Sequence, residues 1–146
     1  MSLDLINYDN AVFRDYAFWM AILVIKTLAM APLTGRQRFK SKIFANAEDA
    51  KRAGGTVKFD NDDVERVRRA HLNDLENILP FAIIGFLYVL TQPSEVLANL
   101  LFKITAISRI VHTVLYLRSS PSRGIAFMVP LGISLYMAIT VLCYFY

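Results

Sequence analysis

Two rows of polar side chains hold the groups in this sequence that could do chemistry. The first row lies in residues 64–77, VERVRRAHLNDLEN, which contain no glycine or proline and are therefore compatible with a helix. At 100° per residue the row spans about 80° of that helix. It supplies two guanidiniums, an amide and a carboxylate, from Arg66, Arg69, Asn73 and Glu76. Such a set favours a small anionic ligand that carries several charges.

The second row lies on another apolar segment, where Arg109, His112 and Tyr116 share one helical face. Both rows interrupt sequence that otherwise suits lipid, so their side chains must face a bundle interior, a partner subunit or a watery cavity. Three plainer interpretations stay open. Ion pairs such as Arg69 with Glu76 would only hold a bundle together, the basic residues would bind anionic lipid head groups, or His112 and Tyr116 would be ordinary core and interfacial residues.

Other kinds of chemistry lack the residues that they need. The two histidines, His71 and His112, fall on different segments without metal-ligand spacing, so we expect no metal. Cys143 is the only cysteine, which excludes an internal disulfide, and its apolar surroundings make it a poor nucleophile. No glycine-rich nucleotide loop is present. The net charge of +4 is not interleaved with exposed aromatics, so we expect no nucleic-acid partner.

Membrane-spanning helices must position these residues, because 55% of the 146 residues are hydrophobic, above the usual share of a soluble protein. A helix that crosses a bilayer needs about 20 predominantly apolar residues. The sequence predicts an all-α, integral membrane four-helix bundle with up-down topology, in one domain over residues 1–146. The helices are expected at residues 11–35, 64–90, 96–117 and 124–145, with a polar cytosolic loop at residues 36–63.

The four segments differ in how well they suit lipid. The last one carries no charge, whereas Lys26 in the first is tolerable only if it faces protein. The second has about 13 apolar residues, at 78–90, and must borrow length from the charged residues before it. Asn61, Asp62 or Asp63 would cap its start. Pro80 should kink this helix without ending it.

Basic residues gather on one side of the predicted bundle. They crowd the loop at 36–63, the start of the second helix and the third connection, RSSPSR at 118–123, while the opposite side offers little beyond Arg14. By the positive-inside rule, the basic connections are cytosolic and both termini are lumenal or external. The acidic N-terminus lacks the features of a signal peptide, so we expect the first helix to remain in the mature protein. A site built from the basic connections would open toward the cytosol.

Four segments together carry a specific resemblance to a known family. They are VERVRRAHLNDLENILPF at 64–81, FANAEDA at 44–50, RIVHTVLYL at 109–117 and RGIAF at 123–127. They resemble the characteristic segments of the membrane-associated proteins in eicosanoid and glutathione metabolism, in order and over nearly the whole chain. Within that family the segments are most similar to the microsomal glutathione transferases, and the prostaglandin E synthases are close to these.

The resemblance implies a homotrimer with glutathione sites between adjacent subunits. It also implies residence in the endoplasmic reticulum membrane, multi-pass with the site facing the cytosol, or in the outer mitochondrial membrane. Glutathione would be the co-substrate, and no metal is implied. By matching position, the glutathione-binding residues would be Arg69, Asn73, Glu76, His112, Tyr116 and Arg123, with Arg38 from a neighbouring subunit. Without the resemblance, Arg123 would read equally well as an anchor at the membrane interface.

The implied chemistry needs the thiolate of glutathione, because the thiol is a poor nucleophile. Lowering the pKa of a thiol by about two pH units requires about 2.7 kcal/mol of preferential stabilisation of the thiolate, which one guanidinium in a poorly hydrated site can supply. The family pattern makes Arg123 the catalytic candidate. The thiolate would attack hydrophobic electrophiles that arrive from the bilayer, or reduce lipid hydroperoxides.

Three positions depart from related proteins of this family. Gly124 and Phe127 stand where prostaglandin E synthase has a serine and a tyrosine, which argues against prostaglandin synthesis. Ala50 stands where the mammalian transferase has a cysteine whose modification activates it, so activation by thiol reagents should be absent. Two alternatives remain: a glutathione-dependent isomerase resembling prostaglandin E synthase, and a non-catalytic lipid-binding regulatory member of the same fold. The presence of Arg69, Asn73, Glu76 and Arg123 favours the enzyme.

Overall fold

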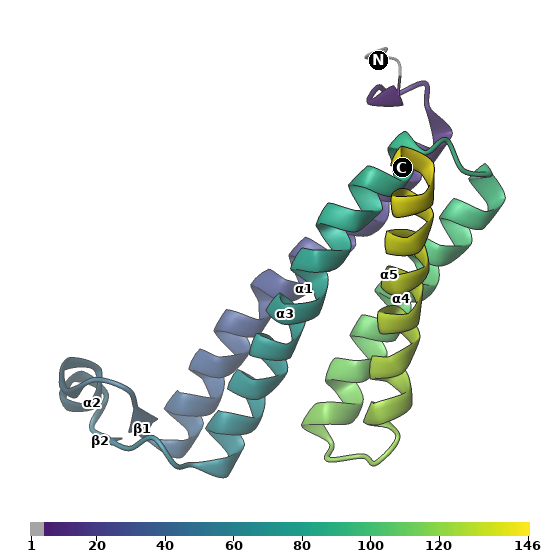
Figure 1. Ribbon diagram of the computed structural model, residues 1–146. Coiled ribbons are helices and arrows are strands. Elements are labelled where there is room, and N and C mark those ends of the chain that lie inside the picture. Colours follow the sequence, from purple (N-terminus) through teal and green to yellow (C-terminus); the bar gives the residue numbers. More distant parts are fainter. Residues whose placement is uncertain (1–4) are drawn as a thin grey trace.

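The computed structural model describes residues 5–146 and consists of four long helices with a small αβ unit between the first two (Figure 1). Each long helix is long and apolar enough to cross a membrane, by length and composition. The predicted class, a four-helix membrane bundle, is therefore confirmed. In chain order the elements are α1 (Ala11–Ser41), β1 (Ile43–Phe44), α2 (Ala47–Ala53), β2 (Thr56–Val57), α3 (Asp62–Leu90), α4 (Glu95–Leu117) and α5 (Arg123–Phe145).

The long helices run alternately up and down. α1 packs against α3 and α4, and α5 packs against α4 and α3, so that the order around the bundle is α1, α3, α5, α4. The start of α1 and the end of α5 lie at one end of the bundle, and the α1–α3 and α4–α5 connections lie at the other (Figure 1). The core between the helices is aromatic and aliphatic, and its fully buried members include Leu23, Phe81, Tyr88, Phe102 and Met137.

α1 extends beyond the expected end at residue 35 and continues to Ser41. Its N-cap is Asn10, whose side chain accepts a hydrogen bond from the Val12 amide at 3.0 Å. The added residues include Arg38 and Lys40, which are good helix formers and place positive charge at the negative end of the helix dipole. The helix ends where Lys42 adopts a left-handed conformation, with φ 55°.

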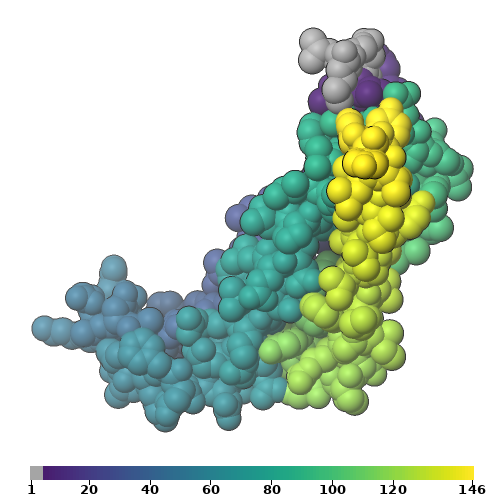
Figure 2. Space-filling model, in the orientation of Figure 1, coloured from purple at the N-terminus to yellow at the C-terminus, as the bar shows by residue number. Residues whose placement is uncertain are grey.

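The expected polar loop at residues 36–63 instead contains an ordered αβ unit. β1 pairs in parallel with β2, Ile43 opposite Thr56, and α2 makes the crossover between them. Phe44 is buried and packs edge-on against Phe39 of α1, with ring centroids 5.3 Å apart. The loop prediction was wrong here because this packing is a tertiary contact that local polarity does not reveal. Figure 2 shows the unit projecting sideways from the bundle, at the lower left.

α3 joins a charged first half to an apolar second half. The side chain of Asn61 accepts a hydrogen bond from the Val64 amide at 3.0 Å, so Asn61 is the cap among the three candidates. The helix continues through Pro80, as expected. α3, α4 and α5 begin one or two residues before the expected positions 64, 96 and 124.

Candidate functional site

A cluster of charged residues lies in the middle of the bundle, where α1, α3 and α4 meet. The carboxylate of Asp74 is fully buried and accepts a hydrogen bond from Nη2 of Arg109 at 2.6 Å. Lys26 of α1 forms an ion pair with the other oxygen of the same carboxylate and also donates to Thr113. Arg109 Nη2 donates in addition to Asn73 Oδ1, at 2.8 Å. Lys26 therefore faces protein, as its place in an apolar helix requires.

The cluster holds two cationic side chains and one carboxylate, so it carries an excess of positive charge. Arg109 is 1% exposed, and two of its nitrogens, Nε and Nη1, are buried with no hydrogen-bond partner within residues 5–146. Buried donors without partners are costly unless a ligand, water or second chain satisfies them. Asp74 and Lys26 were not among the predicted site residues. Asp74 holds Arg109 in place and, through it, Asn73, while Lys26 pairs with Asp74.

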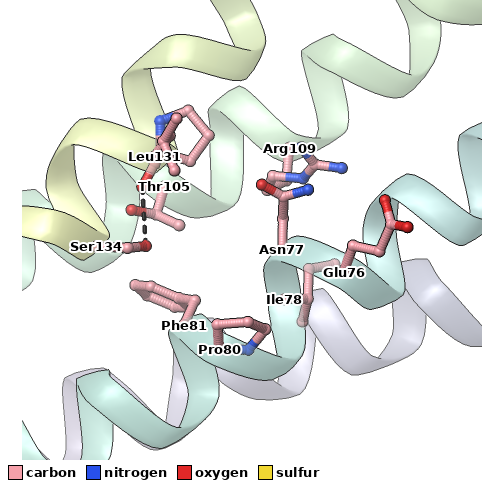
Figure 3. A pocket seen from close by; sticks show the side chains of 10 residues that line it. Glu76, Asn77, Ile78, Pro80, Phe81, Thr105, Arg109, Leu131 and Ser134 are labelled. Carbon is pink, nitrogen blue, oxygen red and sulfur yellow. Dashed lines mark hydrogen bonds between the residues drawn. The ribbon is translucent and has the colours of Figure 1, made fainter.

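A cleft of about 120 Å³ opens beside Arg109, between α3, α4 and α5. Figure 3 shows Arg109, Asn77 and Glu76 toward one end of this cleft, with Phe81 and Leu131 toward the other. The charged and amide groups thus lie at one end of the cleft, whereas at the other end Phe81 and Leu131 lie beside the hydroxyls of Thr105 and Ser134. Its full lining is Glu76, Asn77, Ile78, Pro80, Phe81, Thr105, Arg109, Pro130, Leu131 and Ser134.

A second group of candidate residues gathers where α4 ends and α5 begins. The rings of His112 and Tyr116 have centroids 5.7 Å apart, and Phe127 of α5 lies 6.1 Å from His112. The guanidinium carbon of Arg123 lies 4.9 Å from the centroid of the Tyr116 ring, which is a cation–π contact. Within residues 5–146 no carboxylate lies within 4.0 Å of Arg123. Its charge is held in place without being neutralised by an acid.

The remaining candidates are not brought together within one chain. Arg69 lines a different cleft, between α1 and α3, and forms no ion pair with Glu76 in the described part of the chain. The interpretation of these two residues as a structural pair is therefore not supported, whereas Arg109 does have a structural acid partner. Arg38 lies near the end of α1, where its Nη1 is buried without a partner among residues 5–146. Among residues 5–146 no ion pair joins Arg38 to Glu76.

The charge distribution suits organic anions better than metal ions. Among residues 5–146 there is no group of three or more histidine, cysteine or acidic side chains arranged to hold a metal. The candidate residues are mainly arginines, whose planar guanidiniums bind carboxylates with two parallel hydrogen bonds. The site can thus bind and orient an anionic ligand and stabilise negative charge on it.

Four membrane-length helices around buried charged residues define a multi-pass helical membrane protein. The MAPEG family model matches residues 16–143, and the chain belongs to the MAPEG family. The family resemblance seen in the sequence is thereby confirmed.

The chain is similar to microsomal glutathione transferases and to prostaglandin E synthases, the two groups that its sequence resembles. Microsomal glutathione S-transferase 1 of Mus musculus is 44% identical over 137 residues, which cover 89% of this chain and 88% of that protein. The human protein of the same name is 42% identical with the same coverage. Prostaglandin E synthase of Bos taurus is 42% identical over 128 residues, covering 86% of this chain and 82% of that protein.

Proposed function

We propose that this chain is a membrane-bound glutathione transferase that joins the glutathione thiolate to hydrophobic electrophiles and also reduces lipid hydroperoxides. The names of its relatives support glutathione as the co-substrate. The observation that carries the proposal is the geometry of Arg123, whose guanidinium lies over the Tyr116 ring and is not neutralised by any described carboxylate.

Glutathione has two carboxylates and one amine, which the candidate residues complement in charge. We assign the amine to Glu76, which lines the cleft beside Arg109. We assign the two carboxylates to Arg69 and Arg38. Asn73 is a further glutathione contact, and the hydrogen bond from Arg109 holds it in place. His112 and Tyr116 complete the set beside Arg123.

In the conjugation step, Arg123 stabilises the sulfur of glutathione as a thiolate after its proton has left to water. The thiolate attacks an electrophilic carbon, a carbon–sulfur bond forms, and the leaving group departs with its electron pair. With a hydroperoxide, the thiolate attacks the terminal oxygen and an alcohol leaves. A second glutathione then yields glutathione disulfide and water. Hydrophobic substrates enter from the bilayer, and Phe81 and Leu131 of the cleft offer them apolar surface.

The proposal includes a homotrimer, because the family resemblance implies it and because the buried Nη1 of Arg38 has no hydrogen-bond partner within residues 5–146. A neighbouring subunit would contribute Arg38 to each site. The membrane would be that of the endoplasmic reticulum, or the outer mitochondrial membrane, with the basic connections and the site on the cytosolic side.

A second candidate function is a glutathione-dependent isomerase like prostaglandin E synthase. Its support is the 42% identity to the bovine enzyme. Gly124 and Phe127 argue against it, because neither can donate a hydroxyl hydrogen bond to a substrate. An assay with the prostaglandin endoperoxide as substrate separates the two functions, and the transferase proposal predicts turnover only with simple electrophiles and hydroperoxides.

The test is a conjugation assay with purified protein, glutathione and 1-chloro-2,4-dinitrobenzene, together with the ultraviolet absorbance of the thiolate. We expect thiolate formation on binding and steady conjugate release. Arg52→Ala is the matched control, since it removes an exposed arginine from α2, a helix that holds none of the candidate residues. A protein that binds glutathione but forms neither thiolate nor conjugate would refute the transferase proposal.

A further inference from the structure

A second cleft, separate from the candidate site, lies between α1, α3 and α4 at the end of the bundle that carries the basic connections. Its volume is about 520 Å³, within the range of about 300–1,000 Å³ that is usual for ligand clefts. Three apolar residues, Leu33, Val67 and Leu117, line it together with polar and charged ones. The latter are Arg36, Gln37, Lys40, Asp63, Arg66, Arg118 and Ser119.

The charge of this cleft is strongly positive. Four basic side chains and one acid line it, which gives a formal sum of +3. Within residues 5–146 no carboxylate lies within 4.0 Å of any of the four cations, so Asp63 does not neutralise them. Unpaired cations around one hollow attract a ligand with concentrated negative charge, such as a phosphate.

The position of the cleft along the helices indicates the kind of phosphate. Leu33 belongs to the end of the apolar part of α1, and Leu117 is the last residue of α4. The cleft therefore lies where the helices leave the hydrocarbon and enter the head-group layer. Basic side chains at this level bind anionic lipid head groups. The apolar residues Leu33, Val67 and Leu117 would add little to the binding of a free anion, whereas they could bury the glycerol and first acyl carbons of a lipid.

We propose that this cleft binds the head group of an anionic glycerophospholipid, with the phosphate among Arg36, Lys40, Arg66 and Arg118 and the acyl chains leaving past Leu33 and Leu117. None of these residues belongs to the proposed glutathione set. The inference is therefore independent of the transferase activity.

The experiment measures lipid binding to the purified protein in detergent by native mass spectrometry. The probes are dioctanoyl phosphatidylinositol, dioctanoyl phosphatidylcholine and glycerol 3-phosphate. We compare wild type with Arg66→Gln/Arg118→Gln and with the control Lys51→Gln/Arg52→Gln, which removes the same charge from α2. Wild type should bind the inositol lipid at least tenfold more tightly than the choline lipid, and loss of two cleft cations should weaken binding on the order of 30-fold.

Three results would overturn the proposal. One is equal affinity of the two lipids, and another is an unchanged affinity in the cleft double variant. The third is binding of glycerol 3-phosphate as tight as that of the lipid, which would make the ligand a soluble phosphate. Glutathione titrated into the same samples should not displace the lipid, and displacement would assign the cleft to the glutathione site. If the double variant does not fold, Arg118→Gln alone decides, because Arg118 is exposed and follows the last residue of α4.

Discussion

Arg123 differs from the other candidate arginines in lying over an aromatic ring, that of Tyr116. Like Arg38 and Arg69, it has no carboxylate within 4.0 Å among the described residues. We expect Arg123→Ala to lower kcat about 100-fold, because about 2.7 kcal/mol of thiolate stabilisation is lost. Glutathione affinity should change only a few-fold. Stopped-flow measurement of thiolate absorbance and of conjugate formation separates the two parameters. Arg123→Lys, which keeps the charge but not the planar contact with Tyr116, should fall between.

Glu76 should show the opposite behaviour, since its role is to hold the amine of glutathione. Glu76→Ala is expected to weaken glutathione binding by about 10-fold or more, the worth of a charge-assisted hydrogen bond, and to leave kcat at saturation nearly unchanged. An analogue of glutathione without the amine is the control ligand. Wild type should bind this analogue more weakly than it binds glutathione. The Glu76→Ala variant should bind the analogue at least as tightly as it binds glutathione. Equal losses of affinity and turnover in both the Arg123 and Glu76 variants would contradict this division of roles.

At the level of elements, the buried carboxylate of Asp74 ties three helices together. Asp74→Asn keeps the shape but leaves the buried Arg109 and the half-buried Lys26 without a counter-charge, so we expect a loss of about 3–5 kcal/mol in the free energy of unfolding. Lys26→Met leaves Asp74 and Arg109 as a matched pair and should cost much less. Thermal unfolding in one detergent, followed by circular dichroism, measures both. A Lys26→Met variant as unstable as Asp74→Asn would show that the excess charge is not what matters.

The sequence predicted the four long helices because apolar runs of about 20 residues are typical of membrane-spanning helices. The predicted end of α1, at residue 35, was too early. Polar residues such as those at 36–41 suit an exposed helix as well as a loop, and the packing of Phe39 on Phe44 distinguishes the two. The αβ unit was missed for the same reason, because the contact of Phe44 with α1 joins two separate elements. These misjudgements concern contacts between elements, which periodicity within one element does not encode.

The candidate site, too, was predicted only in part from the sequence. The row of Arg109, His112 and Tyr116 followed from helical spacing, and the structure places all three on the inner side of α4, buried or half-buried. Asp74 was missed because it lies off the polar row of its own helix, and its partner Lys26 is 48 positions away. The available signal was that Lys26 and Arg109 interrupt apolar spans and therefore require a buried counter-charge.

At the scale of the whole molecule, the proposed site draws on two subunits, and mixed trimers test this. A protomer with Arg38→Ala and a protomer with Arg123→Ala should each be nearly inactive as homotrimers. In randomly mixed trimers, three quarters contain both kinds and each has one intact site in three, so about a quarter of all sites should work. Conjugation activity of the co-expressed pair measures this fraction. Background activity in the mixture would mean that Arg38 serves its own chain.

The unequal lengths of the helices have a practical consequence. α1 has 31 residues and α5 has 23, which correspond to about 46 Å and about 35 Å, against a hydrocarbon layer of about 30 Å. We therefore expect the surplus length of α1 to place α2 and the two strands outside the lipid, while the contact of Phe39 with Phe44 holds them against α1. A binder or fused helix placed on α2 would turn together with the bundle. Particle images in electron cryo-microscopy would then gain an alignment mark outside the micelle.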